Sequence, residues 1–408
     1  MSDWKWTGPA APMLVLIEAL RRRGHRVELV CPEPPPGANR SLAEEARRRG
    51  LAPIAAIRAE RSAWRPGDGA RVRRLAQQLE GEAIGGPFDL VHAWHSRDHV
   101  LAARALGRWP RPRLPRAVGA ARPAPRLVRS WPRAEAIPNR PWNRWLFGPA
   151  CDGLLCVSEQ AAAAQRRIRP AGPLAGTLGG VDLERLAQSL AAPAVAVAPQ
   201  PVAPRPREVL GVGDDTFLIG VVARMQAHRR FDLLLGAMRR LADRHPHARL
   251  VIFGRGTHAE EVVGRPMRAL GLADRVILAG HRGDDYAALL AAMDAFAYLA
   301  PGSDGSCRAL REAAALGLPL VGLRCGAIGE IIRDGETGLL VDADADAGAL
   351  AAAFARLIED PVWRHALGAA ARRDAQIRFT PERFAAFVEA FYAEVLASAP
   401  LPAPTSSR

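Results

Sequence analysis

The stretch SDGSCRALREAAALGLPLVG, residues 303–322, holds two acidic side chains that frame a change from loop to helix. Asp304 opens a loop of small residues, and Glu312 follows inside a segment that favours a helix. After Leu318 and Pro319 the chain becomes apolar, as in a buried strand. Such a loop presents unpaired backbone N–H groups and the positive end of a helix dipole, which favour anions. The stretch therefore predicts either a binding loop for a phosphate and a hydroxylated sugar, or an acidic cap on an ordinary helix.

Strand-like and helix-like segments alternate on both sides of this stretch. In the C-terminal half, amphipathic helical segments separate the apolar strand segments FLIGVVAR (217–224), ARLVIFGRG (248–256), RVILAG (275–280), AFAYLAP (295–301), LPLVGL (318–323) and TGLLVD (337–342). The N-terminal half alternates in the same way within residues 13–33, 88–106 and 151–168. This alternation predicts an α/β protein with doubly wound parallel sheets, whose ligands lie beyond the carboxyl ends of the strands.

The length of 408 residues is typical of two domains rather than one. An Ala/Pro-rich segment of low complexity separates two α/β halves and predicts a linker. The predicted parts are a first domain at 1–186, a linker at 187–212, a second domain at 213–378, a C-terminal helix at 379–396 that packs back toward the first domain, and a tail at 397–408. Two doubly wound domains that face each other form a cleft, where we expect the chemistry.

The positive charge is concentrated in the first half of the chain. Residues 1–190 contain 31 Lys and Arg against 17 Asp and Glu, so 31 − 17 = +14, which is the net charge of the whole chain. A basic surface attracts anionic lipid, nucleic acid or phosphorylated substrates. Compositional bias toward Arg is the alternative, although it does not explain the asymmetry. Because no recognised nucleic-acid-binding module is present, we expect no nucleic-acid partner.

Targeting and redox signals are weak. No run of 18 apolar residues predicts a transmembrane helix, and the N-terminus lacks the apolar core of a signal peptide. The five cysteines are scattered and odd in number, which favours a reducing compartment over a disulfide framework. We therefore expect a cytoplasmic protein.

A second candidate motif is basic. Arg224 follows an apolar strand, and Arg229 comes five residues later, before a helix. Two guanidinium groups in one strand–helix loop can clamp a diphosphate, since their geometry matches phosphate oxygens. The alternative is a solvated basic turn. The histidines of VHAWHSRDH (91–99) have no accompanying carboxylate cluster, so we expect no metal site.

The C-terminal half resembles the retaining GT-B glycosyltransferases of the large family that contains many bacterial lipopolysaccharide and glycolipid transferases. The segments that carry the resemblance lie within residues 215–345: VARMQAHRRFDLLL (222–235), FGRG (253–256), LAGHRGD (278–284), DGSCRALREAAALGLPLVG (304–322) and GAIGEIIRDGETGLLVD (326–342). In the first half, CVSEQ (156–160) and GGVDLERL (179–186) resemble the family more weakly. The resemblance implies two Rossmann-like domains facing a cleft.

The resemblance assigns a donor site to the second domain. Arg224 and Arg229 would act on the donor diphosphate, with Arg229 at the position where the family has Lys. Asp304 would hold hydroxyls of the donor sugar, although it is one methylene shorter than the family's usual Glu. The other implied donor contacts, to the base, the diphosphate and the ribose, come from Arg282, Gly305, Ser306, Cys307, Arg308, Ala309 and Glu312.

The resemblance also implies acceptor-side residues in the first domain. Gly8 matches the Gly-rich first loop, and relatives have a strand before this loop, so we expect that strand to be missing here. His95 and Arg97 follow a strand and are expected to contact the acceptor. In many members a His after the next strand touches the transferred sugar; the corresponding segment, AVGAARPAPRL (117–127), contains Arg122 instead.

The expected function is that of a retaining glycosyltransferase. It would move a sugar from a UDP- or GDP-type nucleotide sugar to a lipid-linked or cell-envelope saccharide, as in lipopolysaccharide or glycolipid synthesis. The nucleotide sugar is a co-substrate, and neither a metal nor another cofactor is expected. The basic half is consistent with peripheral contact to an anionic membrane at its cytoplasmic face. The alternative is a catalytically weakened GT-B protein that binds sugar nucleotides or a partner.

Overall fold

In the computed structural model, the described residues are 4–6, 10–38, 41–56, 87–108, 124–191, 204–300 and 305–399. The chain divides into two compact units, one of residues 1–180 with 381–408 and the other of residues 181–380. The division falls after residue 180, where the sequence placed it after 186. The two ends of the predicted linker are helical, since α7 (Leu183–Ala191) and α8 (Pro206–Val209) reach into it.

The second unit is built on a six-stranded parallel sheet. Its strands are β7 (Phe217–Val222), β8 (Ala248–Phe253), β9 (Val276–Gly280), β10 (Ala295–Tyr298), β11 (Leu320–Leu323) and β12 (Gly338–Val341). All four residues of β10 and of β11 are buried, as are five of the six residues of β7. Strands that are covered on both faces need nearly continuous apolar sequence, which explains the runs AFAY and FLIGVV.

The strand order in this sheet is β12-β11-β10-β7-β8-β9. The order reverses between β7 and β10, which pair in parallel with Ala295 opposite Ile219. In open α/β sheets ligands bind at such a switch point, beyond the carboxyl ends of the strands. The predicted doubly wound sheet is confirmed, and its switch point lies where the loops after β7 and β10 begin.

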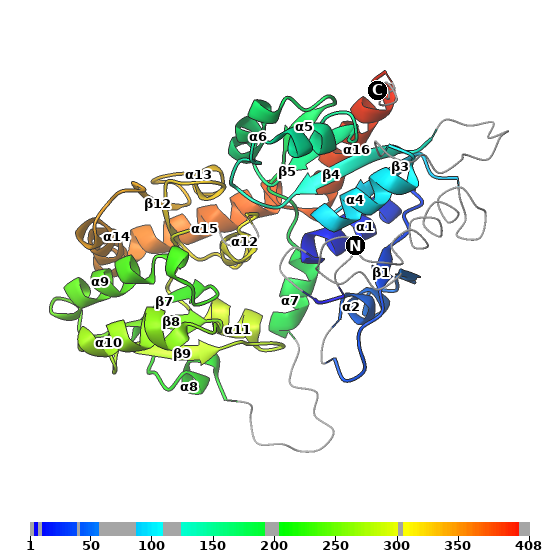
Figure 1. The fold of residues 1–408 in the computed structure, drawn as a ribbon. Helices are drawn as coiled ribbons and strands as arrows, with labels where there is room; N and C mark the ends of the chain where they lie inside the picture. The colour runs from blue at the N-terminus through cyan, green and yellow to red at the C-terminus, as the bar shows by residue number, and fades with distance from the viewer. Residues whose placement is uncertain are drawn as a thin grey trace, which may run out of the picture. The chain divides into compact units, whose positions relative to one another are not determined.

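Helices cover both faces of this sheet (Figure 1). The α-helices in the described part of this unit are α7 and α8, introduced above, and α9 (Phe231–Ala242), α10 (Arg265–Ala269), α11 (Tyr286–Ala291), α12 (Arg308–Ala315), α13 (Ile328–Ile331), α14 (Ala347–Glu359) and α15 (Pro361–Arg378). The stripe of Phe231, Leu234, Leu235 and Met238 on α9 is buried in the main hydrophobic cluster of the unit. The same 3.6-residue periodicity was visible in the sequence.

The first unit contains a four-stranded parallel sheet of order β3-β4-β5-β6 and a separate parallel pair, β1-β2. The strands are β1 (Val30–Pro32), β2 (Ile54–Ala56), β3 (Leu90–Ala93), β4 (Arg126–Trp131), β5 (Gly153–Cys156) and β6 (Leu174–Gly176). The helices are α1 (Ala10–Arg22), α2 (Leu42–Arg48), α4 (Ser96–Ala105), α5 (Pro141–Phe147), α6 (Glu159–Gln165) and α16 (Pro381–Ala397). The expected absence of a first strand stays a prediction.

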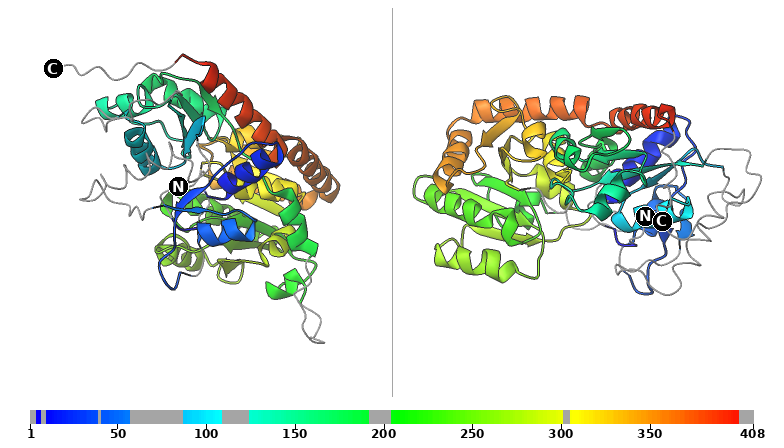
Figure 2. Two further views of the ribbon diagram at one scale, coloured as in Figure 1. Left: turned by 90° about the vertical axis from the view of Figure 1, so that its right-hand side faces the viewer. Right: turned by 45° about the horizontal axis from the view of Figure 1, so that its top comes forward.

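The C-terminal helix α16 belongs to the first unit and packs against α1. Figure 2 shows the two helices side by side, α16 in red and α1 in blue. Phe384, Val388 and Phe391 of α16 share a buried cluster with Leu14 and Ile17 of α1. None of the helices in the described ranges combines the length and apolarity needed to cross a membrane.

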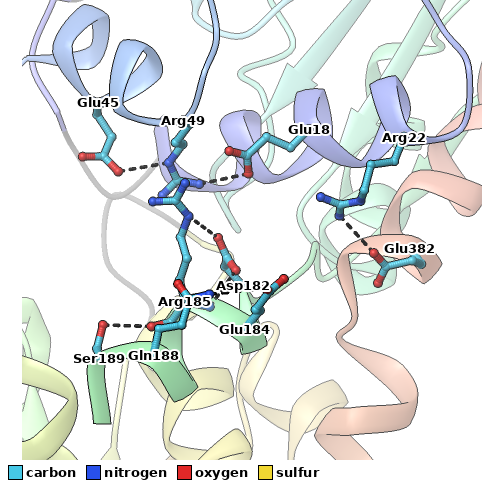
Figure 3. A network of polar contacts seen from close by, with 10 residues as sticks. All are labelled: Glu18, Arg22, Glu45, Arg49, Asp182, Glu184, Arg185, Gln188, Ser189 and Glu382. Atoms are coloured by element: carbon cyan, nitrogen blue, oxygen red, sulfur yellow. Dashed lines mark hydrogen bonds and ion pairs between the residues drawn. The ribbon is translucent and has the colours of Figure 1, made fainter. Parts of the chain in front are cut away.

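Ion pairs connect neighbouring helices of the first unit (Figure 3). The side chain of Arg49 is 7% exposed and lies between two carboxylates, at 3.0 Å from Glu45 and 3.3 Å from Glu18. It thereby joins the end of α2 to α1. Arg22 of α1 pairs with Glu382 of α16 at 2.9 Å. Because this pair is exposed to solvent, it contributes little to the stability of the fold.

Two of the three histidines in VHAWHSRDH are neutral: His99 is buried, and His92 is half-buried. The ring of His92 contacts the hydroxyls of Tyr392 at 2.6 Å and of Ser130 at 2.8 Å. His99 is buried and packs against Phe147, and the centres of the two rings are 5.4 Å apart. Burial, aided by the charge of Arg129, lowers the pKa of both His92 and His99 to about 3. Both rings are structural members of the first unit.

These two histidines should make the first unit sensitive to acid. Because the folded pKa lies below the unfolded pKa, the unfolded chain binds more protons as pH falls below about 6.5, and stability is lost between that pH and about 3. At about pH 5 each histidine should cost on the order of 2 kcal/mol.

Thermal unfolding compared at pH 7.5 and pH 5 measures the loss. The His92→Gln variant should show a smaller acid-dependent decrease than the wild type. The variant His247→Gln, at an exposed position, should keep the full decrease. An equal Tm at both pH values would contradict the assignment of neutral rings.

Candidate donor-binding site

The two loops at the switch point of the second sheet carry the predicted donor residues. The loop after β7 contains Arg224, which is exposed, and Arg229, which is half-buried. The loop after β10 leads to Gly305 and Ser306 and then to α12. Because β7 and β10 are neighbours and parallel, both loops emerge at the same edge of the sheet.

Arg229 is held against the beginning of the loop that follows β10. Its Nη1 donates to the carbonyl of Ala300, and its guanidinium lies 5.4 Å from the centre of the Tyr298 ring. A cation above an aromatic ring is attracted by the negative face of the ring. The second arginine of the predicted motif therefore links the two switch-point loops directly.

The two glycines of FGRG allow the loop after β7 to approach the loop after β8 closely. A Cβ on Gly254 would lie 2.0 Å from the carbonyl oxygen of Ala223, and one on Gly256 would lie 2.5 Å from that of Met225. Gly254 also has φ = +148°, which other residues rarely adopt. These glycines allow the close approach of the backbone around Arg224, and neither carries a side chain that could contact a ligand.

The start of α12 has the geometry of an anion site. Cys307 is buried at the N-cap position with φ = 51°, and its side chain does not cap the helix. The N-cap of α9, Arg230, has a similar left-handed conformation, φ = 57°. Only three described residues other than glycine have positive φ, and these two end the switch-point loops. Backbone strain of this kind is concentrated at functional sites.

The acidic side chain of α12 lies in a polar cluster. Glu312, whose side chain is 13% exposed, accepts a hydrogen bond from the hydroxyl of Tyr286 at 2.9 Å. Its other oxygen lies 3.5 Å from Nε of Arg308. Burial, reinforced by the charge of Glu312, raises the pKa of Tyr286 well above its usual value. Glu312 is thus a held carboxylate and not a freely solvated one.

Among the remaining predicted donor residues, Arg282 precedes α11 and Ala309 lies in α12. Arg282 forms an ion pair with Asp285, which joins the loop after β9 to the start of α11. Ala309 is buried in the first turn of α12, so only its backbone can face a ligand. Asp304 lies outside the described residues, and its role stays a prediction.

Two of the four predicted acceptor residues, His95 and Arg97, follow the carboxyl end of β3 in the first unit's sheet. His95 is the N-cap of α4, two residues after the end of β3. The backbone N–H of His95 donates a hydrogen bond to the carboxylate of Asp98 at 2.7 Å. Arg97 is half-buried in the first turn of the same helix. Gly8 lies outside the described residues.

The position of β4 changes the reading of Arg122. The strand after β3 begins only at Arg126, so Arg122 precedes it and lies outside the described residues. The carboxyl end of β4 is Trp131. A residue that follows this strand, as the family's His does, would be found near Trp131 and not near Arg122.

Sequence reasoning missed a buried arginine at this edge. Arg129 of β4 is 1% exposed and donates to the carbonyls of Ala93, at 3.4 Å, and Trp94, and to the hydroxyl of Ser96, at 3.3 Å. Burial lowers its pKa to about 10. Arg129 therefore fixes the loop that carries His95. Nothing in a single sequence distinguishes it from the many exposed arginines of this chain.

The fold and these loops define a two-domain α/β protein of the GT-B class, and comparisons with known proteins agree. Residues 216–360 match the family model for glycosyl transferases group 1, and residues 8–185 match the model for glycosyltransferase family 4. The chain therefore belongs to the GT-B glycosyltransferases. Among solved structures, Anabaena HepE in complex with UDP has a TM-score of 0.71 at 17% identity, over 96% of this chain and 98% of that chain.

Curated relatives are more similar over shorter spans. A GDP-mannose-dependent phosphatidylinositol monomannoside mannosyltransferase from Mycolicibacterium smegmatis is 32% identical over 47% of this chain and 49% of its own length. A lipopolysaccharide core mannosyltransferase from Rhizobium leguminosarum is 32% identical over 44% and 51%. A D-inositol 3-phosphate glycosyltransferase from Thermobifida fusca is 26% identical over 72% and 67%. The matched region thus spans about half the length of the first and second of these relatives.

Proposed function

We propose that this protein is a retaining, metal-independent glycosyltransferase that uses a UDP- or GDP-type sugar donor. The single observation that carries the proposal is the meeting of Arg229 with the loop before α12 at the switch point of the second sheet. A half-buried cation and the N-terminus of a helix favour a diphosphate there. Glu312, held by Tyr286, supplies a carboxylate for the hydroxyls of a ribose.

In the proposed reaction, the bond between C1 of the sugar and the diphosphate oxygen breaks, and its electron pair goes to the diphosphate. The acceptor hydroxyl forms the new bond to C1 on the same face, and its proton passes to a diphosphate oxygen. Arg224, Arg229 and the backbone N–H groups near Arg308 and Ala309 stabilise the negative charge on the leaving group. Asp304 holds hydroxyls of the sugar during transfer.

The relatives support a nucleotide-sugar donor but leave its base open. HepE is described in complex with UDP and with UDP-glucose, whereas the mycobacterial relative depends on GDP-mannose. Several relatives act on inositol phosphates, phosphatidylinositol mannosides or lipopolysaccharide core. The names with a phosphatidylinositol mannoside and with lipopolysaccharide core support an acceptor that is a lipid-linked or cell-envelope saccharide, contacted through His95 and Arg97, whereas the inositol phosphate names do not.

We propose that the protein is cytoplasmic and binds the membrane peripherally, and the charge asymmetry supports the membrane contact. The surplus of positive charge lies entirely in the first 190 residues, which contain the predicted acceptor side. Basic surfaces gain affinity for anionic lipid, and salt screens this attraction. Sedimentation with phosphatidylglycerol vesicles at low salt tests this part; a protein that stays in the supernatant would refute it.

A melting screen tests the donor assignment. UDP, GDP or ADP at about 100 times its Kd should add about 2.7 kcal/mol of apparent stability. For a unit of roughly 200 residues this corresponds to a rise in Tm of about 5–10 °C. The matching nucleoside monophosphate is the control, because it lacks the second phosphate for Arg229. If no nucleoside diphosphate or its sugars raised the Tm, the proposed function would fail.

A further inference from the structure

The carboxylate of Glu312 is fixed from a different helix. The hydroxyl of Tyr286, the first residue of α11, lies 2.9 Å from Oε2 of Glu312 in α12. The Tyr286 ring is itself set edge-on against Phe253 of β8, with centroids 6.5 Å apart and planes at 89°. The orientation of Glu312 therefore depends on the packing of three elements and not on its own helix alone.

The contact leaves part of the carboxylate available. A carboxylate has about four acceptor positions. Tyr286 occupies one on Oε2, and Arg308 lies 3.5 Å from Oε1. The side chain of Glu312 retains 13% of its exposure, so one edge is open. Since burial keeps the phenol protonated, Tyr286 acts as a hydrogen-bond donor at any physiological pH.

We propose that Tyr286 is a positioning residue, which holds the Glu312 carboxylate in the orientation that accepts hydrogen bonds from the ribose hydroxyls of the donor. This inference rests on the proposed function. A glutamate without such a partner must lose rotamer freedom when a ligand binds, whereas a preoriented one has already lost it. Tyr286 thus acts through Glu312 and needs no contact with the ligand.

The readout that separates positioning from general stability is discrimination between a ribonucleotide and its 2′-deoxy counterpart. The experiment measures, by titration calorimetry, the Kd values of UDP, GDP and ADP and of their 2′-deoxy forms for the wild type and for Tyr286→Phe. Phenylalanine keeps the ring contact with Phe253 and removes only the hydroxyl. We expect the affinity for the ribonucleotide to fall about fivefold, the effect of one hydrogen bond. The affinity for the 2′-deoxy form should change much less.

The chain offers a matched control in Tyr392, whose hydroxyl contacts His92 in the other unit. Tyr392→Phe also removes a hydrogen-bonded, half-buried hydroxyl and should leave the ratio of the two affinities unchanged. In a Glu312→Gln background, the further change Tyr286→Phe should have no additional effect on the ribonucleotide. If the loss of ribonucleotide affinity in the double variant equalled the product of the losses in the two single variants, the inference would be overturned.

The outcomes distinguish the inference from the function on which it rests. If the wild type binds none of the six nucleotides, the proposed function and the inference both fail. If the wild type binds but Tyr286→Phe weakens ribose and 2′-deoxy forms equally, or weakens neither, the donor site stands and the positioning role of Tyr286 is refuted.

Discussion

Replacing Arg229 with alanine should lower kcat/KM for the donor by about 10²-fold or more, the loss expected when a preorganised cation at a leaving diphosphate is removed. The guanidinium is held on two sides, by the carbonyl of Ala300 and by the ring of Tyr298. It therefore needs no reorganisation when negative charge develops at the start of the loop after β10. Steady-state kinetics with the donor selected by melting measure the effect.

The substitution Arg229→Lys separates charge from geometry. Lysine retains the positive charge but cannot direct one nitrogen to Ala300 and another toward a phosphate, since it has a single ammonium group. We expect an intermediate loss of about tenfold, because the lost hydrogen bond comes from a charged group and is worth more than a neutral one. A lysine variant as active as the wild type would show that the contact with Ala300 is dispensable.

The control for Arg229 lies on the following helix. Arg239 of α9 is exposed and pairs with Asp243 at 3.0 Å, so Arg239→Ala should leave kcat/KM almost unchanged. Both alanine variants are melted in parallel, so that a loss of activity is compared only between folded proteins. An Arg229→Ala protein with wild-type kcat/KM would exclude this residue from the donor site.

The architecture of the second unit was largely predictable from its sequence. Buried parallel strands require continuous apolar runs, and runs such as FLIGVV and AFAY are not interrupted by charge. The strand order then brings together Arg229 and the loop before α12, although the two are far apart in the chain. The sequence therefore predicted the two loops of the candidate site, and the topology explains why they meet.

The first unit was harder to predict because charged side chains interrupt its strands. The segment RLVRSW contains two arginines and does not resemble a buried strand, yet it forms β4. The structure accommodates Arg129 by bonding it to the backbone of the preceding loop and Arg126 by pairing it with Asp152. For this reason the segment after the next strand was assigned to residues 117–127, although that strand ends at Trp131, and the acceptor role of Arg122 stays a prediction.

Hydrogen bonds between side chains of different elements could not be predicted from the sequence either. The contact between Tyr286 and Glu312 joins residues 26 positions apart, on two helices that follow different strands of the sheet. No local spacing rule relates such residues. The one signal was the rarity of tyrosine: there are three in the chain, and one of them begins the helix after the predicted base-binding Arg282.

Asp152 is the position at which a single substitution should most destabilise the first unit. Its carboxylate is 2% exposed, pairs with Arg108 at 2.5 Å and Arg126 at 3.3 Å, and accepts the backbone N–H of Leu127 at 2.6 Å. Asp152→Ala would leave two largely buried guanidinium groups and one buried N–H without this acceptor. Removing one partner of a buried ion pair typically costs about 3–5 kcal/mol.

The loss of Asp152 should also loosen the end of α16, because Arg126 donates a hydrogen bond to the backbone carbonyl of Ser398, just beyond this helix. Asp152→Ala should therefore lower the Tm of the first unit by about 10 °C and hasten proteolysis at the end of α16. Asp214→Ala is the matched control: it removes an exposed carboxylate, 3.1 Å from Arg205, and should change stability by less than about 0.5 kcal/mol. If Asp152→Ala melted like the wild type, as Asp214→Ala should, Arg108 and Arg126 would have sufficient other partners. The ion pairs of Asp152 would then contribute nothing to the stability of the first unit.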